Sequence, residues 1–412
     1  MKEKKKVSLA VQIFIGLALG IVAGILFMVS GKAEWASTYV KPFGTIFLNL
    51  IKFIVVPIVL TSIISGVISM KDIRKVGSIG WKTVVYYMCT TACAVVIGLL
   101  FANIFKGTFQ VLQTTDLEYE VAASVSFMDT LVNIFPSNFI QPLADATMLQ
   151  VIVIALFFGF GIIIAGEKGE ALGKVVNSLS DVSMVIMDLI LKLSPIGVFC
   201  LITPVVAENG PKILGSLAMV LLTAYICYIV HAVVVYSATV KAMGGLSPAK
   251  FFKGMAPAMV MAFSSASSVG TLPLNLECAE KLGAKKDVAS FVLPLGATIN
   301  MDGTAIYQGV CAVFIAACYG IHLTLPQMVT IVLTATLASV GTAGVPGSGM
   351  VMLAMVLQSV GLPIEGIALV AGVDRIFDMG RTTVNITGDA ACSIIVSRLE
   401  ERKEKRMSSK AV

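Results

Sequence analysis

The stretch VDRIFDMGRTTVNITGD (residues 373–389) lies inside an apolar run near the end of the chain, yet it carries five charged side chains. They are Asp374, Arg375, Asp378, Arg381 and Asp389. On an α-helix, where successive residues are rotated by about 100°, all of them except Arg375 would share one face with Asn385. The opposite face is apolar. A helix with this pattern packs its apolar side against lipid or protein and turns its polar side toward a polar cavity.

The whole chain has the composition of a membrane protein. Of its 412 residues, 57% are hydrophobic and 13% are charged, and its mean hydropathy is +0.93. A soluble chain of this length would carry roughly 25% charged residues. Eight apolar segments are suited to crossing a bilayer, and they fall near 8–30, 43–70, 78–105, 127–166, 175–207, 213–240, 287–320 and 363–396.

The charges between these segments predict the topology. Basic or mixed loops lie at 71–75, 167–174, 241–253 and 280–286, whereas the loop TTDLEYE (114–120) is acidic. Eight crossings would place every basic loop and both termini in the cytoplasm, as the positive-inside rule requires. The basic ends MKEKKK and EERKEKR are short, so they predict solvated anchors beside the bilayer and no nucleic-acid partner.

Two shorter apolar segments, 254–276 and 326–361, are broken by residues that disfavour helices. The first contains AFSSASSVGTLPLN (262–275) and the second ASVGTAGVPGSGM (338–350), although residues 303–364 hold no Asp, Glu, Lys or Arg. Non-helical backbone at membrane depth needs cover from protein or a water-filled cavity. We therefore predict two re-entrant helical hairpins of opposite entry, as in transporters built from inverted repeats. A pair of kinked ordinary spans is the alternative.

The charged stretch needs partners, because each buried charge costs roughly 2.5–3.5 kcal/mol in a bilayer. One interpretation is an internal ion-pair network, since Asp378 and Arg381 are three residues apart. The stretch has three acids and at most two bases, however, so at least one carboxylate needs another cation. This favours a binding site.

A second polar cluster, GATINMDGTA (296–305), predicts an unwound stretch whose carbonyl, Asn and Asp oxygens suit a hard cation such as Na⁺. No base lies near Asp302 in the sequence, so a bound cation is its expected partner, with protonation as the alternative. Tyr87, Thr90 and Thr91 add polar groups on another span, although hydroxyls there commonly bond their own helix.

SSVGTLP, GATINMDGTA, GTAGVPGSG and DMGRTTVNITGD together resemble the signature motifs of the dicarboxylate/amino acid:cation symporters, the glutamate transporter family. The likeness runs over nearly the whole chain and is greatest to the prokaryotic sodium-coupled aspartate/glutamate branch. It implies an all-α membrane protein with eight transmembrane helices and two re-entrant hairpins, working as a homotrimeric, elevator-type transporter. The implied domains are scaffold at 1–70, third span and outer loop at 71–125, scaffold at 126–210, transport domain at 211–400 and a basic cytoplasmic tail at 401–412.

The resemblance also implies the site residues. Asp378 would bind a substrate ammonium group and Arg381 the side-chain carboxylate, which suits a planar guanidinium. The other substrate contacts would be Thr382, Asn385, Thr304, Ser268, Val345 and Gly349. Sodium would be held at one site by Gly296, Asn300, Asn385 and Asp389, at another by Thr298, Ser339, Val340 and Thr342, and at a third by Tyr87, Thr90, Thr91, Asn300 and Asp302. No organic cofactor is expected.

Three positions depart from the family pattern. Ala266 stands where archaeal aspartate transporters have an arginine, and Met379 where animal members have one. Arg375, one turn before Met379, is the candidate to supply the missing charge. Gln308 stands where animal members carry a glutamate implicated in proton and potassium coupling, which argues for sodium alone. Bacterial members that use protons keep the coupling ion open.

We therefore expect a sodium-coupled importer of L-aspartate or L-glutamate, embedded in the inner (plasma) membrane of a prokaryote. The alternatives are a proton-coupled glutamate carrier, a C4-dicarboxylate carrier, or a carrier for cystine or neutral amino acids. Arg381 argues against the neutral substrates, and Asp378 argues against a substrate without an amine. An intramembrane protease is disfavoured, because no histidine lies near the serines of 264–268 and no GxGD motif is present. A primary channel would not need this charge pattern.

Overall fold

The computed structural model describes residues 9–69, 78–109, 111, 132, 135–145, 147–210, 213–339 and 348–408. These residues are helical almost throughout, and none of them lies in a β-strand, which confirms the all-α class. The main helices are α1 (Leu9–Val29), α3 (Lys41–Ser69), α5 (Ser78–Phe105), α7 (Gln141–Ala144), α8 (Met148–Ala165), α9 (Glu167–Leu191), α10 (Ser194–Asn209), α11 (Ile213–Val230), α13 (Pro248–Ser265), α14 (Ser268–Lys281), α15 (Lys286–Ile299), α16 (Asp302–Cys318), α17 (Leu325–Ala338), α18 (Ser348–Ser359), α19 (Ile367–Ala371) and α20 (Asp374–Ser408).

Several helical stretches are long and apolar enough to cross a membrane. Among the described residues there are four, at Val11–Val29, Ser78–Thr108, Leu214–Gly244 and Lys286–Cys318. Of the other expected crossings, 43–70 coincides with α3, 127–166 contains α8, and 363–396 contains α19 and the first part of α20, which holds the charged face. The expected span 175–207 is divided in two, because α9 ends at Leu191 and α10 begins at Ser194. Pro195, which lacks an N–H group, suits the first turn of a new helix better than a helix interior.

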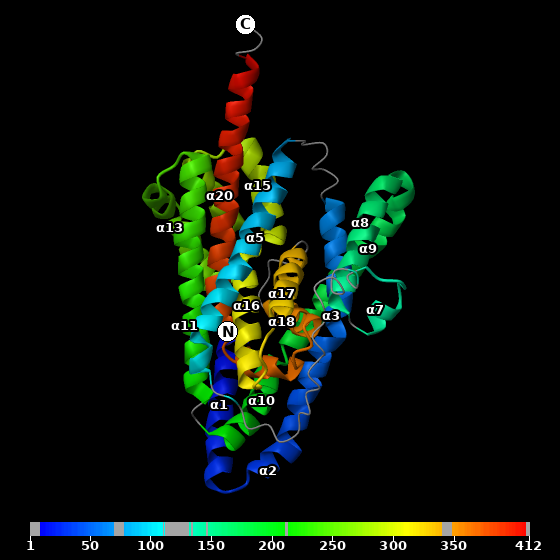
Figure 1. Cartoon of the computed structure of the whole chain (residues 1–412), viewed down its shortest axis with the longest axis vertical. Helices are drawn as coiled ribbons and strands as arrows, with labels where there is room; N and C mark the ends of the chain where they lie inside the picture. Colours follow the sequence, from blue (N-terminus) through cyan, green and yellow to red (C-terminus); the bar gives the residue numbers. More distant parts are fainter. Residues whose placement is uncertain are drawn as a thin grey trace, which may run out of the picture.

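The first group of helices consists of α1, α3, α8, α9 and α10 (Figure 1). Within it, α1 and α10 pack closely because α1 has Gly16, Gly20 and Gly24 at a spacing of four residues. A Cβ atom at Gly16 would overlap the Pro195 carbonyl, and one at Gly24 would lie 2.7 Å from the Thr203 carbonyl oxygen. Small residues at this spacing let two backbones approach within a membrane.

The second group surrounds the long helix α20, which contacts α5, α11, α13, α14, α15 and α16. Figure 1 shows α20 running beside α15 and extending beyond its neighbours at the C-terminal end. Between α15 and α16 the helix is interrupted at Asn300, whose backbone is extended (φ −87°, ψ 99°). Of the predicted unwound stretch at 296–305, only Asn300 and Met301 are non-helical, because α15 runs to Ile299 and α16 begins at Asp302.

The two broken segments form helical hairpins. In the first, α13 turns back into α14 at Ala266, which has a left-handed backbone (φ 51°) and is the one non-glycine residue with positive φ in the described part of the chain. In the second, α17 and α18 are joined through residues 340–347, which lie outside the described part. α13 and α14 pack on α20, whereas α17 packs on α5 and α18 on α16. The tip of the first hairpin at Ser265 and the first turn of α18 at Gly349 both lie against the polar face of α20.

Candidate functional site

Arg381 lies at the centre of the polar face of α20 and is almost fully buried (2% exposed). Its Nε donates to Asp378 Oδ1 at 2.8 Å, and its Nη1 and Nη2 donate to the two oxygens of Asp374 at 3.2 and 3.5 Å. The Tyr307 ring covers the guanidinium, with 4.9 Å between Cζ and the ring centre. This buried charge is therefore compensated on two sides by acids of its own helix.

Arg375 lies at the edge of the same cluster. Its Nη2 donates to the Ser265 carbonyl at 3.0 Å, and its Nη1 lies 3.8 Å from Asp378 Oδ2. The cluster thus contains two bases, Arg375 and Arg381, and two acids, Asp374 and Asp378. The internal ion-pair network considered from the sequence therefore exists in the first half of the stretch, residues 374–381. The unmatched carboxylate expected from the charge count lies elsewhere, at Asp389.

The second hairpin reaches this cluster through Gly349, in the first turn of α18. A Cβ atom at this position would overlap the Arg381 guanidinium. Only a residue without a side chain therefore lets the hairpin backbone approach so closely. Gly349 is thus placed beside Arg381 as expected, whereas its predicted partner Val345 lies outside the described residues.

Asp389, about two turns after Arg381 on α20, forms a second buried cluster with Asn300, which lies between α15 and α16. Asn300 Nδ2 donates to Asp389 Oδ1 at 2.9 Å and to the Asn385 carbonyl at 3.0 Å. Asn300 Oδ1 is buried and accepts no hydrogen bond from the residues that the structure describes. The Gly296 backbone lies against both the Asp389 carboxylate and the Tyr87 hydroxyl, where a Cβ atom would overlap them. In the described ranges no Lys or Arg approaches the Asp389 carboxylate within 4.0 Å.

This second cluster fits a sodium ion chemically. Among the described residues it offers a carboxylate without a basic partner and a buried amide oxygen without a donor. Hard cations prefer such oxygen ligands. An unpaired buried acceptor otherwise costs about 1–3 kcal/mol, so an additional ligand would stabilise this arrangement.

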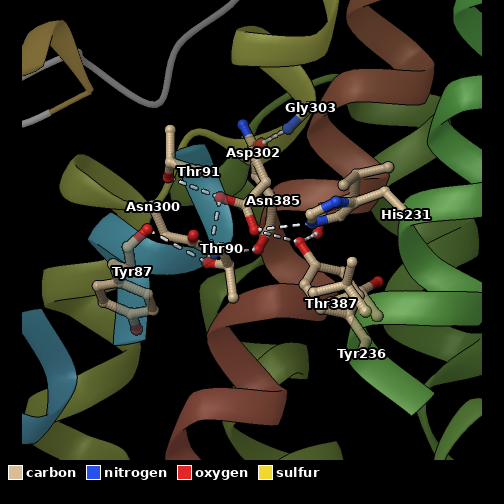
Figure 2. A network of polar contacts seen from close by, with 12 residues as sticks. Tyr87, Thr90, Thr91, His231, Tyr236, Asn300, Asp302, Gly303, Asn385 and Thr387 are labelled. Atoms are coloured by element: carbon tan, nitrogen blue, oxygen red, sulfur yellow. Dashed lines mark hydrogen bonds and ion pairs between the residues drawn. The ribbon is translucent and has the colours of Figure 1, made fainter. Parts of the chain in front are cut away.

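Asp302 is fully buried between α5 and the π-helical segment His231–Tyr236 that follows α11 (Figure 2). Its Oδ1 accepts from Thr91 at 2.7 Å and from Thr90 at 3.3 Å. Its Oδ2 accepts from Tyr236 at 2.8 Å and lies 3.1 Å from His231 Nε2. The expectation that Asp302 has no base nearby is therefore wrong. His231 and Tyr236 come from 71 and 66 residues earlier in the chain, so local spacing could not reveal them.

The remaining predicted site residues divide into two sets. Asn385 Oδ1 accepts from the Gly303 amide at 2.7 Å, which ties α20 to the start of α16. Three other predicted substrate contacts are buried, namely Thr304, Thr382 and, in the first turn of α14, Ser268. Thr298 is exposed and Ser339 bonds the carbonyl of Thr336 in its own helix, so no described contact joins them to the clusters. Val340 and Thr342 lie outside the described residues.

Comparison with known proteins gives a consistent result. A family model for the sodium:dicarboxylate symporter family matches residues 9–399. A proton/sodium-glutamate symport protein of Geobacillus stearothermophilus is 38% identical over 96% of this chain and 95% of its own length. A proton/glutamate-aspartate symporter of Escherichia coli is 35% identical over 97% and 95%. A C4-dicarboxylate transport protein of Bacillus subtilis is 30% identical over 98% and 96%.

Proposed function

Since the chain belongs to the sodium:dicarboxylate symporter family, we propose that it imports an acidic amino acid, L-aspartate or L-glutamate, together with sodium ions. The protein is a multi-pass transporter of the inner membrane and not an enzyme. Its substrate is a dicarboxylate in the broad sense that includes glutamate. The amino-acid substrate, the sodium coupling, the site residues and the cytoplasmic position of both termini are parts of the proposal.

The observation that carries the proposal is the buried Arg381 between two acids, with Gly349 of the second hairpin against it. A guanidinium binds a carboxylate with two parallel hydrogen bonds. A substrate side-chain carboxylate would therefore accept hydrogen bonds from the Nη groups of Arg381 that now donate to Asp374. The substrate ammonium group would bind Asp378. Ser268, Asn385, Thr304 and Thr382 would complete the substrate contacts, with Val345 supplying backbone groups from the second hairpin.

Sodium coupling is supported by the unmatched Asp389 and the open Asn300 oxygen. We assign Gly296, Asn300, Asn385 and Asp389 to one ion. Because Asn385 also contacts the substrate region through Gly303, ion and substrate would order the same backbone. Each ligand would then raise the affinity for the other. The assignment of Tyr87, Thr90, Thr91 and Asp302 to another ion, and of Thr298, Ser339, Val340 and Thr342 to a further one, stays a prediction.

We further propose that the two groups of helices are a scaffold and a moving transport domain, with the boundaries given from the sequence. The scaffold would assemble as a homotrimer. Helix α9 has a stripe of exposed apolar side chains, namely Leu172, Val175, Leu179, Val182, Val185 and Leu189. Their spacing of three and four residues is typical of helix–helix contacts. The exposed Asp181 lies beside this stripe; a carboxylate is disfavoured against lipid, which favours a second copy of the chain as its cover.

Two observations favour a second candidate, a proton-coupled or dicarboxylate carrier with the same architecture. The Asp302 carboxylate is already surrounded by Thr90, Thr91, His231 and Tyr236, which leaves few free positions for a metal ion. In addition, Asp378 has internal partners and does not require a substrate ammonium. Both alternatives place the substrate at Arg381.

Uptake into proteoliposomes tests these candidates together. Labelled aspartate, glutamate and succinate are supplied under an imposed sodium gradient or an imposed proton gradient, each without the other. We expect aspartate or glutamate to accumulate with sodium alone. Accumulation only under the proton gradient would show that the coupling ion is the proton. Preferential accumulation of succinate would show that the substrate is a C4-dicarboxylate without an amine.

A further inference from the structure

Arg375 differs from Arg381 in donating a hydrogen bond to a backbone carbonyl of another helix. Its guanidinium lies between the tip of the first hairpin, at Ser265, and the carboxylate of Asp378. Resting on the proposed function, in which Asp378 binds the substrate ammonium, we infer that Arg375 weakens the preference for amino acids over dicarboxylates without an amine. Arg375 is thus a residue that determines specificity through Asp378.

The position of Arg375 is fixed by the end of helix α13. Ser265 is the last residue of this 18-residue helix, and its carbonyl has no partner in the next turn because Ala266 turns out of the helix. The C-terminal end of a helix carries partial negative charge and attracts a guanidinium. The hydrogen bond from Nη2 to the Ser265 carbonyl at 3.0 Å therefore holds the positive charge in place.

The charge of Arg375 lies beside Oδ2 of Asp378. Arg381 Nε occupies Oδ1 at 2.8 Å, and Arg375 Nη1 lies 3.8 Å from Oδ2. The other nearby acid, Asp374, faces Arg381. An ammonium binding at Oδ2 would thus lie close to a like charge, which lowers its affinity. A substrate that has only carboxylates would avoid this repulsion.

The contact of 3.8 Å is longer than a hydrogen bond, so the effect on Asp378 is electrostatic. Charge and hydrogen bonding can then be separated by substitution. Arg375→Gln removes the charge and keeps an N–H donor that can bond the Ser265 carbonyl. Arg375→Lys keeps the charge and loses the fork that spans both partners.

The experiment measures the dissociation constants of aspartate and succinate for purified wild type, Arg375→Gln and Arg375→Lys at one salt concentration. We expect the ratio of succinate to aspartate dissociation constants to rise about tenfold in the glutamine variant, as for the loss of one partly screened charge. In the lysine variant the ratio should stay within about twofold of wild type, even if both affinities fall. Arg375→Met, which also removes the charge, replaces the glutamine variant if that one does not fold.

An unchanged ratio in the uncharged variant would overturn the inference, and so would an equal change in the lysine and glutamine variants, because charge would then not be the cause. The proposed function fails separately. If wild type binds neither aspartate nor glutamate, the amine site itself is wrong, and this is known before any variant is compared.

Discussion

Arg381 donates a hydrogen bond from Nε to Oδ1 of Asp378, 2.8 Å away and three residues earlier on α20. In our proposal these two residues bind opposite charges of the substrate, yet in this structure each is a counter-ion of the other. Substrate binding would therefore exchange internal ion pairs for external ones of the same sign. Such an exchange avoids leaving a buried charge unpaired, which costs about 3–5 kcal/mol.

Replacing Arg381 by alanine should abolish recognition of acidic substrates. The variant loses the bidentate partner of the substrate carboxylate, and we expect the aspartate affinity to fall about 100-fold or more. Equilibrium binding to purified protein measures the loss. Arg381→Lys is the matched control for charge: it should bind more tightly than the alanine variant and more weakly than wild type. An alanine variant with wild-type affinity would refute the role of Arg381.

The Arg381 variants also need a control for assembly. Removal of the guanidinium leaves Asp374 and Asp378 as neighbouring buried acids, so a loss of stability accompanies the loss of binding. Size-exclusion chromatography should show the same oligomer for wild type and variant. A variant that assembles normally and no longer binds substrate separates the two effects.

Asp389→Asn should weaken sodium binding and, through it, substrate binding. The amide keeps the shape of the carboxylate but removes its charge. We expect the sodium concentration that half-saturates aspartate binding to rise about tenfold, and the aspartate affinity at a subsaturating sodium concentration to fall, because the two ligands are coupled. Asp145→Asn, at an exposed aspartate, is the control. An unaltered sodium dependence in the Asp389 variant would show that this carboxylate is not an ion ligand.

Gly349→Ala should hinder the approach of the second hairpin to Arg381. The added methyl group would overlap the guanidinium, which is held by its acidic partners and can move only by stretching those bonds. We expect aspartate affinity to fall about tenfold or more. Gly215→Ala, in α11 where no atom lies within 4 Å of the new methyl group, should bind as wild type does. Equal affinities in the two variants would contradict the contact.

The architecture could be predicted to a large extent because its signals are local. Helix breakers in an apolar background indicated both hairpins, and the polar cluster GATINMDGTA (296–305) indicated a break that the structure has at Asn300. The polar face of α20 could be predicted because its charged residues recur at helical spacing. The division of the expected span 175–207 was missed, because its apolar character continues across the helix start at Pro195.

The site was predicted less completely, because its partners are distant in sequence. Charge counting found that one carboxylate lacked a base but could not say that Asp374 would bind Arg381 in preference to Arg375. His231 was not predicted as a partner of Asp302, because the two residues are 71 positions apart in the chain. A lone histidine in an otherwise uncharged span is a signal that could have been used, since burial of such a side chain requires a polar partner.

His231→Leu should destabilise the protein, because Asp302 Oδ2 would lose one of its two described partners and keep Tyr236. We expect a loss of about 1–3 kcal/mol, the cost of an unsatisfied buried group. It would be measured as a lower unfolding midpoint in detergent without substrate or sodium. His231→Gln, which retains a donor, should lose less, and His322→Leu, at the exposed second histidine, should unfold as wild type does. If the two leucine variants have the same midpoint, the contact between His231 and Asp302 contributes nothing to stability.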